Sequence, residues 1–427
     1  MSIRSKAAFA FAIPALAAGP AACGDDTSTS SNTTTGAAAG GGKATGTVDV
    51  YSSLPLQGAS KPQTNAMVDG IKLALKQAGS KAGGVTVKYE SLDDSTAKEG
   101  KWEPNQVASN ARKAAQDKKA VAYIGEFNSG ASAISIPLLN AVGLAMVSPA
   151  NTAVGLTKKE TGSTPGEPQK YYPSGPRNYA RIVPRDKYQA ADLVQQMKAD
   201  GCQNLAMAND KEVYGGGLAT LIDDQAKQQG LKLVTNDGIQ KDAANFRAFA
   251  SKIKGLGADC FVFAGVTANG AIQIAKDVNA ALPQAKLYGG DGICESGFTN
   301  EKKKGIPSSV AKQFKCTVGT LDLNSYPGGK KFIAAFDAEY QDANPDPYAI
   351  YGYEAMSLVL DTITRAGAKG TTKEGVLKAL FETRDRDSVL GKYSIDRDGD
   401  TTLTDYGLFK VGSDGNTEYV ATLKFRG

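Results

Sequence analysis

The chain has 427 residues, of which 41% are hydrophobic and 22% are charged, and its formal net charge is +5 at pH 7. That charge is far too small for a nucleic-acid-binding surface on a chain of this length. The chain contains no histidine, which removes the usual ligand of zinc sites and the usual general base of serine hydrolases, so we expect neither a zinc site nor an enzyme.

Residues 1–22 have the pattern of a secretory signal peptide. Arg4 and Lys6 precede an apolar run, and small residues lead up to Cys23. The run is too short to cross a bilayer, which takes ~20 helical residues. Cys23 resembles the lipidated cysteine of bacterial lipoproteins, although Pro20 stands where their motif usually has leucine. We expect an extracytoplasmic, lipid-anchored protein; the alternative is a soluble secreted protein in which Cys23 has no role.

Residues 23–46 are small and polar and show no hydrophobic periodicity. Such a segment cannot bury enough apolar surface to fold. A random coil of about 23 residues spans ~25 Å on average. We therefore expect a disordered tether that lets the folded part stand off from a membrane.

Beyond the tether, β-rich runs alternate with helical patterns at intervals of roughly 30 to 40 residues, which is typical of repeated βαβ units. The first set comprises expected strands at 47–52, 85–90, 121–124, 145–147 and 179–183, and expected helices at 63–78, 105–116 and 131–140. The alternation of strands and helices then begins again with the helix at 188–199. The second set comprises expected strands at 204–208, 231–235, 261–264 and 286–289, and expected helices at 188–199, 216–229, 245–255 and 270–280.

This repetition predicts two α/β lobes with parallel sheets. We expect one lobe to comprise residues 47–182 with 318–398, and the other to comprise residues 183–317 with 399–427. Ligands of open parallel sheets bind beyond the carboxyl ends of the strands. The expected binding site is therefore a cleft between the lobes.

Loops at those strand ends carry groups that suit the two charges of an amino acid. Ser129 follows a strand and opens a helix, where hydroxyl and backbone N–H groups favour a carboxylate. Thr152 offers a hydroxyl in a second loop, and Asp291 lies between glycines after a third strand. Each residue also has a purely structural explanation, Ser129 as an ordinary N-cap and Asp291 as part of a turn.

Four cysteines lie beyond the tether, and none is in a C-x-x-C motif. Disulfides are the expected state of an exported protein, and four cysteines allow three pairings. Cys202 and Cys260 lie at the starts of two strands that are expected to be neighbours. We favour Cys202 with Cys260 and Cys294 with Cys316, although the sequence alone does not choose among the pairings.

Two further motifs do not indicate a bound metal or cofactor. The acidic run from Asp396 to Asp400 lacks the glycine and glutamate positions of an EF-hand loop, and we expect a hairpin turn before a strand at 403–411. The glycines at 215–217 lack the spacing of a dinucleotide-binding loop. We expect no cofactor and no metal.

Several short motifs occur in order along the chain. They are Ile124-Gly-x-x-x-Ser129, Ser148-Pro-Ala-Asn-Thr152, Arg181-x-x-x-x-Asp186, Asp210-x-x-x-Tyr214-Gly and Gly289-Gly-Asp291-Gly. Together they resemble the type I periplasmic binding proteins, specifically the leucine/isoleucine/valine-binding branch that serves ABC importers. The resemblance implies two Rossmann-like lobes that are joined by three hinge crossings and close on a free amino acid.

The resemblance also implies residue roles. Ser129, Ala150 and Thr152 match the positions that bind the ligand carboxylate, and Asp291 matches the acidic partner of the ligand ammonium, where the family often has glutamate. The residues expected to line the pocket are Glu126, Phe127, Asn128, Asn151, Tyr214, Thr267 and Trp102, with Tyr351 as a further candidate. Trp102 lies at the cleft rim, where it covers either the ligand or only its own lobe.

The implied function is that of a monomeric solute-binding protein that captures a branched-chain or related amino acid and delivers it to an ABC permease. An alternative is a sensor that uses the same clamp for an amino-acid-like, amide or aromatic-acid ligand without transport.

Overall fold

The computed structural model describes residues 44–424. The expected signal peptide, Cys23 and the tether up to residue 43 lie outside the described residues. Within residues 44–424, no helix combines the length and the apolar character that a membrane span requires.

Six strands form the first sheet, in the order β2-β3-β1-β4-β5-β6. They are β1 (Gly46–Leu54), β2 (Lys81–Ala82), β3 (Val85–Asp93), β4 (Ala120–Gly125), β5 (Ala145–Ser148) and β6 (Tyr179–Arg181). All neighbours run parallel except β2 and β3. β4 is buried along its whole length, as a parallel strand with both faces covered should be.

Seven strands form the second sheet, in the order β15-β14-β11-β10-β9-β7-β8. They are β7 (Asn204–Asn209), β8 (Lys232–Gly238), β9 (Cys260–Ala264), β10 (Lys286–Gly289), β11 (Phe314–Val318), β14 (Tyr406–Val411) and β15 (Thr417–Leu423). Strands β7 to β11 run parallel, whereas β14 and β15 are antiparallel to their neighbours. Both β1 and β7 lie between two strands that follow them in the chain, and ligand sites of open sheets form where the strand order reverses in this way.

Helices cover both sheets. The α-helices are α1 (Lys61–Gln77), α2 (Pro104–Gln116), α3 (Ser129–Asn140), α4 (Asp186–Ala199), α5 (Val213–Gln229), α6 (Arg247–Gly255), α7 (Ile272–Ala281), α8 (Ser296–Thr299), α9 (Ser308–Ala311), α10 (Gly329–Tyr340), α11 (Ala349–Arg365) and α12 (Lys373–Phe381). Shorter turns are η1 (Val154–Leu156), η2 (Gln169–Tyr171), η3 (Thr267–Ala271), η4 (Asp291–Ile293), η5 (Glu301–Lys303), η6 (Leu323–Ser325) and η7 (Gly367–Lys369). Strands β12 (Arg386–Ser388) and β13 (Gly391–Tyr393) form a separate hairpin.

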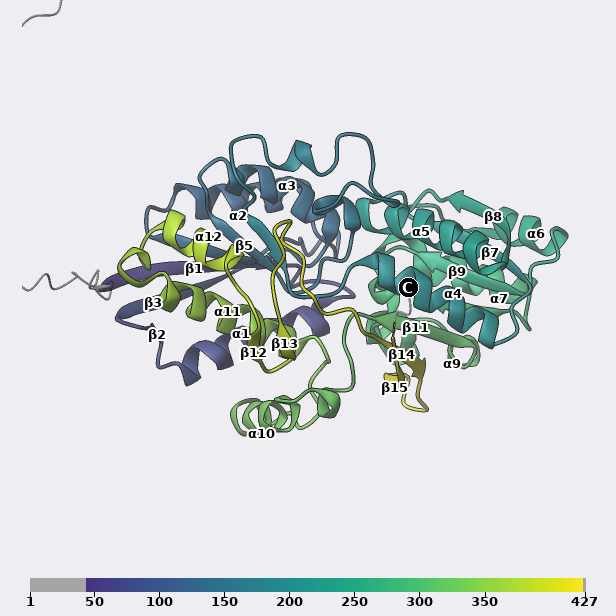
Figure 1. Ribbon diagram of the computed structural model, residues 1–427. Coiled ribbons are helices and arrows are strands. Elements are labelled where there is room, and N and C mark those ends of the chain that lie inside the picture. The colour runs from purple at the N-terminus through teal and green to yellow at the C-terminus, as the bar shows by residue number, and fades with distance from the viewer. Residues whose placement is uncertain (1–43, 425–427) are drawn as a thin grey trace, which may run out of the picture. The chain divides into compact units, whose positions relative to one another are not determined.

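Helix α11 returns the late part of the chain to the first sheet, where it packs on α1. Figure 1 shows α11 and α12, in yellow-green, beside β1, in purple. Gly70 of α1 and Gly352 of α11 permit this close contact. A Cβ atom at Gly70 would lie 2.1 Å from the carbonyl oxygen of Ala349, and one at Gly352 would lie 2.1 Å from that of Met67.

The α/β class and the parallel-dominated sheets agree with the sequence analysis, but the bounds of most elements differ by one to three residues. The strand expected at 403–411 begins at Tyr406 and pairs with β11 and β15. The expected turn before it is present, since Ile395 and Thr401 form an antiparallel bridge. The helix expected at 270–280 begins at Ile272, because Gly270 has a φ of +86° inside the turn η3. The strand expected at 179–183 ends at Arg181. The lobe boundaries stay a prediction.

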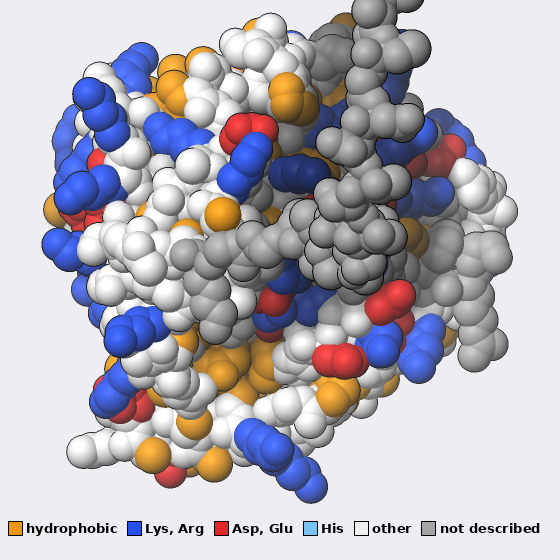
Figure 2. All heavy atoms as spheres, turned by 60° about the vertical axis from the view of Figure 1, so that its left-hand side comes forward, with side chains coloured by type: hydrophobic (Ala, Val, Ile, Leu, Met, Phe, Trp, Pro, Cys, Tyr) orange, Lys and Arg blue, Asp and Glu red, His pale blue; other side chains and the backbone are white. Residues whose placement is uncertain are grey.

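Basic side chains do not gather into one patch on the face drawn in Figure 2. Lysine and arginine side chains are spread among neutral and acidic ones there. This distribution fits the small net charge of the chain and does not resemble a nucleic-acid-binding surface.

Candidate functional site

A small cavity lies where loops from the two sheets meet. Its lining residues are Phe127, Asn128, Ser129, Ala150, Thr152, Tyr214, Val266, Asp291, Gly292 and Tyr348. Nine of them follow β4, β5, β7, β9 or β10, and Tyr348 precedes α11. Three larger surface hollows contain none of the predicted ligand-binding residues. The smaller cavity is therefore the candidate site.

Ser129 is the first residue of α3 and is 3% exposed. The N-cap position is occupied by Asn128, whose side chain makes no capping hydrogen bond. Ser129 is thus not the N-cap of α3, which was the purely structural explanation for this residue. The start of α3 instead presents backbone N–H groups without a side-chain cap, at the helix end that attracts anions.

The loop after β5 turns around the hydroxyl of Ser148. Its Oγ accepts a hydrogen bond from the backbone N–H of Ala150 at 3.2 Å. This turn brings Ala150 and Thr152 into the cavity lining. The backbone N–H of Ala153 donates to Oγ of Ser129 at 3.4 Å, which links the loop to the start of α3.

Asp291 begins the turn η4 directly after β10. Its Oδ1 accepts hydrogen bonds from the hydroxyl of Tyr214 at 2.7 Å and from the amide of Gln189 at 2.8 Å. Its Oδ2 accepts a longer one from the hydroxyl of Tyr348 at 3.4 Å. All three donors are neutral, and burial raises the pKa of the Asp291 carboxyl above its ordinary value.

A second buried carboxyl group lies near Asp291. Asp186 begins α4 and is 0% exposed, and its backbone N–H donates to the carbonyl of Thr152 at 2.9 Å. Burial, and then the charge of Asp291, raise the pKa of Asp186 well above its ordinary value. Two buried acidic groups favour a cationic ligand, because a nearby positive charge compensates the hydration that the carboxylates lose on burial.

Sequence reasoning missed Gln189 and Tyr348. Gln189 lies three residues after the end of the motif Arg181-x-x-x-x-Asp186 and belongs to none of the motifs singled out in the sequence. Tyr351 was named in place of Tyr348, but its hydroxyl points elsewhere and donates to the carbonyl of Gly319 at 2.7 Å. Both tyrosines lie at the start of α11, and no local pattern tells which of them faces a cavity built from distant loops.

Of the seven residues expected to line the pocket, Phe127, Asn128 and Tyr214 line this cavity. Glu126 does not, because its side chain is 0% exposed and accepts a hydrogen bond from the hydroxyl of Tyr123 at 2.8 Å. Asn151 does not either, because its amide donates to the carbonyls of Glu126 at 3.0 Å and Phe127 at 2.9 Å. The side chains of Glu126 and Asn151 therefore hold the cavity loops by hydrogen bonds on the side away from the cavity.

Thr267 and Trp102 also lie outside the lining. The hydroxyl of Thr267 donates to the carbonyl of Gly292 at 3.4 Å, one residue beyond the lining residue Val266. Trp102 packs over the start of α3, where a Cβ atom at Gly130 would lie 2.9 Å from its ring. This position agrees with the reading in which Trp102 covers its own lobe.

The acidic run at 396–400 pairs with basic side chains. Nζ of Lys158 lies 2.7 Å from Oδ2 of Asp396 and also contacts Asp398. Asp400 accepts from Nε of the fully buried Arg181 at 2.9 Å. These ion pairs with lysine and arginine account for the cluster of acidic residues.

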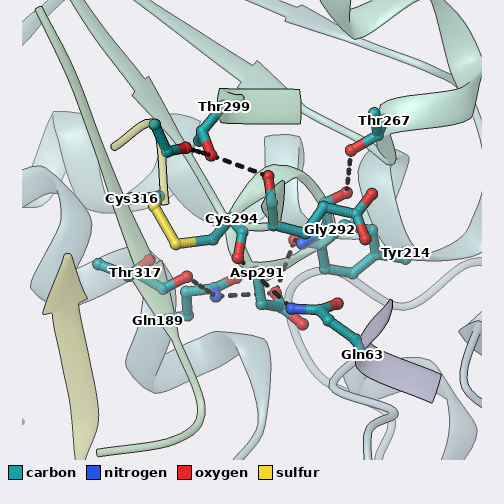
Figure 3. The surroundings of a disulfide bond; sticks show 12 residues. Gln63, Gln189, Tyr214, Thr267, Asp291, Gly292, Cys294, Thr299, Cys316 and Thr317 are labelled. Atoms are coloured by element: carbon teal, nitrogen blue, oxygen red, sulfur yellow. Dashed lines mark hydrogen bonds between the residues drawn. A yellow bond between two sulfur atoms is a disulfide. The ribbon is translucent and has the colours of Figure 1, made fainter. Parts of the chain in front are cut away.

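Two disulfides are present among the described residues. Cys202 is bonded to Cys260, with Cα atoms 5.9 Å apart, and Cys294 is bonded to Cys316, with Cα atoms 5.6 Å apart. These are the pairs that the sequence analysis favoured. The second disulfide lies three residues after Asp291, and Figure 3 shows it beside the hydrogen bonds of that residue.

Two α/β units with a cavity at the carboxyl edges of their sheets define a type I periplasmic binding protein, a class of substrate-binding proteins that are not enzymes. The chain belongs to the periplasmic binding protein family, whose sequence model matches residues 52–416. Its relatives are of the branched-chain amino acid type. Membership in this family places the protein outside the cytoplasm, as the sequence analysis expected.

The chain is 26% identical over 372 residues to the Leu/Ile/Val-binding protein homolog 2 of Brucella abortus (strain 2308), covering 86% of this chain and 91% of that one. Its fold is similar to that of the leucine binding protein LivK of Thermotoga maritima MSB8, with a TM-score of 0.73, 20% identity and coverage of 88% and 98%. It is also similar to a solute binding protein of an ABC transporter from Rhodopseudomonas palustris HaA2 in complex with p-hydroxybenzoic acid, with a TM-score of 0.71, 17% identity and coverage of 88% and 97%.

Proposed function

We propose that this protein captures a free α-amino acid with an apolar side chain in the cavity between its two lobes and delivers it to an ABC importer. One observation carries the proposal: a single small cavity is lined by Ser129 and Thr152 on the side of the first sheet and by Asp291 on the side of the second. In this proposal, Ser129, Ala150 and Thr152 bind the ligand carboxylate and Asp291 binds the ammonium.

The charges of the cavity suit a zwitterion in this orientation. A buried charge without a partner costs several kcal/mol, whereas each charge-assisted hydrogen bond contributes ~1.5 to 3 kcal/mol. The start of α3 is a positive pole for the carboxylate. Asp291 and Asp186 supply a negative pole for the ammonium. Because the two poles come from different lobes, a bound amino acid stabilises the closed arrangement.

The walls of the cavity favour a small apolar side chain. Phe127 and Tyr348 form one wall, with ring centroids 6.0 Å apart and the rings edge to face, and Val266 contributes an aliphatic side chain. Leucine, isoleucine and valine meet these conditions.

An aromatic acid is the second candidate ligand, and the raised pKa of Asp291 favours it. A benzoate-like molecule has a carboxylate but no ammonium, so it would require Asp291 to be protonated. The structural neighbour from Rhodopseudomonas palustris that holds p-hydroxybenzoic acid shows that such a ligand fits this fold. The two candidates differ in their pH dependence, which the binding experiment exploits.

The lipid anchor, the delivery step and the monomeric state are parts of the same proposal. Cys23 and the polar tether that follows it would hold the binding domain near a permease in the membrane. The alternative is a sensor that uses the same cavity without import. Uptake of the bound solute in a strain that lacks this protein separates the two, because unchanged uptake would exclude delivery as its main role.

Calorimetric titration of the protein from residue 44 onward tests the ligand. We expect L-leucine, L-isoleucine or L-valine to bind at pH 8 and benzoate and p-hydroxybenzoate to bind weakly or not at all. Tight binding of p-hydroxybenzoate, strengthened at pH 5, together with no binding of any amino acid, would overturn the amino-acid assignment in favour of the aromatic acid.

A further inference from the structure

The Cys294–Cys316 disulfide closes a short loop around Asp291. Gly289, the last residue of β10, is the register partner of Cys316 in β11, and Cys294 is bonded to the same Cys316 five positions later. The loop that carries Asp291 is therefore attached to Cys316 at both of its ends. Figure 3 shows Asp291 with Gln189, Tyr214 and this disulfide around it.

Gln189 makes a second connection between Asp291 and strand β11. Its side-chain amide donates to Oδ1 of Asp291 at 2.8 Å and to the carbonyl of Thr317 at 3.2 Å. Thr317 is the residue that follows Cys316. The carboxylate and the disulfide-bonded strand are thus held by one buried amide group, since Gln189 is 0% exposed.

The same loop also contacts the other lobe. The side-chain amide of Gln63, in α1, donates to the carbonyl of Cys294 at 3.4 Å, and both residues are buried. At Gly297, close after this loop, a Cβ atom would lie 2.7 Å from the carbonyl of Ala59. Any shift of the Asp291 loop would therefore disturb the contact between lobes as well as the carboxylate itself.

We propose that the Cys294–Cys316 disulfide and Gln189 are positioning elements that fix the Asp291 carboxylate at the distance the ligand ammonium requires. The proposal rests on the proposed function, because it takes Asp291 as the ammonium partner. A charge-assisted hydrogen bond is strong only when its partners are held in place, and displacement by ~1 Å can reduce a site's performance about 100-fold. Neither Gln189 nor either cysteine lines the cavity, so both elements act through Asp291.

The second disulfide provides a matched control. Cys202 and Cys260 lie at the amino-terminal ends of β7 and β9, which is the edge of the sheet opposite to the cavity. Its two cysteines are 58 residues apart, whereas Cys294 and Cys316 are 22 residues apart. Since longer loops lose more stability when a disulfide is removed, C202S/C260S should reduce stability at least as much as C294S/C316S. A purely structural role for both disulfides would then predict no selective effect of C294S/C316S on binding.

The experiment compares C294S/C316S, C202S/C260S and Gln189→Met with the parent protein. The first readout is hydrogen exchange of the backbone amides of residues 290–294 without ligand, which does not depend on the identity of the ligand. The second is the affinity for L-leucine by calorimetry. We expect exchange at 290–294 to become about 10-fold faster or more in C294S/C316S, and its L-leucine affinity to fall about 10-fold or more. C202S/C260S should change neither.

Gln189→Met keeps both disulfides and the side-chain length but removes the amide. It should lower the L-leucine affinity, and it tests the proposal if C294S/C316S does not fold. Unchanged exchange and affinity in C294S/C316S, equal losses in the two disulfide variants, or full affinity in Gln189→Met would overturn the positioning role. If the parent protein binds none of L-leucine, L-isoleucine and L-valine, the proposed function fails, while the exchange measurement still decides whether the disulfide holds the loop.

Discussion

Arg181 is fully buried and donates from Nε to Oδ1 of Asp400 at 2.9 Å, across 219 positions of the chain. Its other nitrogens donate to the carbonyl of Asn151 at 3.0 Å and to the hydroxyl of Thr157 at 2.7 Å. This guanidinium therefore joins the end of β6, the loop that carries Thr152, and the segment that leads to β14. The shape of the predicted carboxylate-binding loop depends on a contact that the local sequence does not contain.

Removing Asp400 should destabilise the whole protein. Asp400→Ala leaves the guanidinium of Arg181 buried without its charge partner, and breaking such a pair costs about 3 to 5 kcal/mol. Asp223→Ala is the control, because it removes an exposed pair with Lys227 within helix α5 that is worth less than about 1 kcal/mol. Denaturant unfolding measures both variants, and similar losses of stability in the two would contradict the importance of the buried pair.

Asp291→Asn should weaken L-leucine binding without affecting folding. Asparagine has the same shape but no charge, and the loss of a charge-assisted hydrogen bond of ~1.5 to 3 kcal/mol corresponds to about 10- to 100-fold in affinity. Calorimetry measures the change, and Tm should remain close to that of the parent. Tyr351→Phe is the control, since this hydroxyl lies outside the cavity lining. Undiminished affinity in Asp291→Asn would show that Asp291 does not bind the ligand ammonium.

The affinity for L-leucine should fall as the pH is lowered through the raised pKa of Asp291. An ammonium group favours the ionised carboxylate, so its binding below that pKa must displace a proton from Asp291. Titrations in two buffers of different ionisation enthalpy should detect proton release on binding. Proton uptake, or an affinity that rises at low pH, would indicate an acid without an ammonium group.

Glu295→Gln should stabilise the protein at pH 8 and have little effect at pH 4. Burial raises the pKa of Glu295 to about 7 from 4.5. Between pH 4.5 and about pH 7, this carboxyl group is therefore protonated in the folded state and ionised in the unfolded state. The stability from this group is complete below pH ~4.5 and is lost as the pH rises through about 7, which amounts to up to about 3 kcal/mol. Tm measured at both pH values tests the sign. Equal effects of the substitution at pH 4 and pH 8 would show that the group does not titrate in this way.

Gly352→Ala should destabilise the packing of α11 on α1. The new methyl group would meet the carbonyl of Met67 at 2.1 Å, and overpacking of this kind costs about 1 to 3 kcal/mol or more. Gly216→Ala in α5 is the control, because its nearest neighbour lies at 3.9 Å and alanine favours a helix by roughly 0.5 to 1 kcal/mol. Chemical denaturation should therefore show opposite signs for the two substitutions. An unchanged free energy of unfolding in Gly352→Ala would mean that α1 and α11 can move apart without a loss of stability.

The alternation of strands and helices was predictable from the sequence because it depends on local hydrophobic periods. Runs such as Ala120–Gly125 are apolar throughout, and a strand covered on both faces requires this. The loops that follow such strands were predictable as well, since parallel strands place their carboxyl ends at one edge. Ser129, Thr152 and Asp291 were named on that basis and Tyr214 through the family resemblance, and the structure brings all four to one cavity.

The rest was decided by contacts between distant parts of the chain. Asn151 has the same polar character as its neighbours in the cavity, but its side chain turns into the protein, where it accepts a hydrogen bond from the hydroxyl of Tyr179 in β6. Tyr348 reaches the cavity only because α11 packs on α1 of the first sheet. A sequence determines which groups follow which strand, whereas the direction of each side chain depends on the packing of elements that are far apart in the chain.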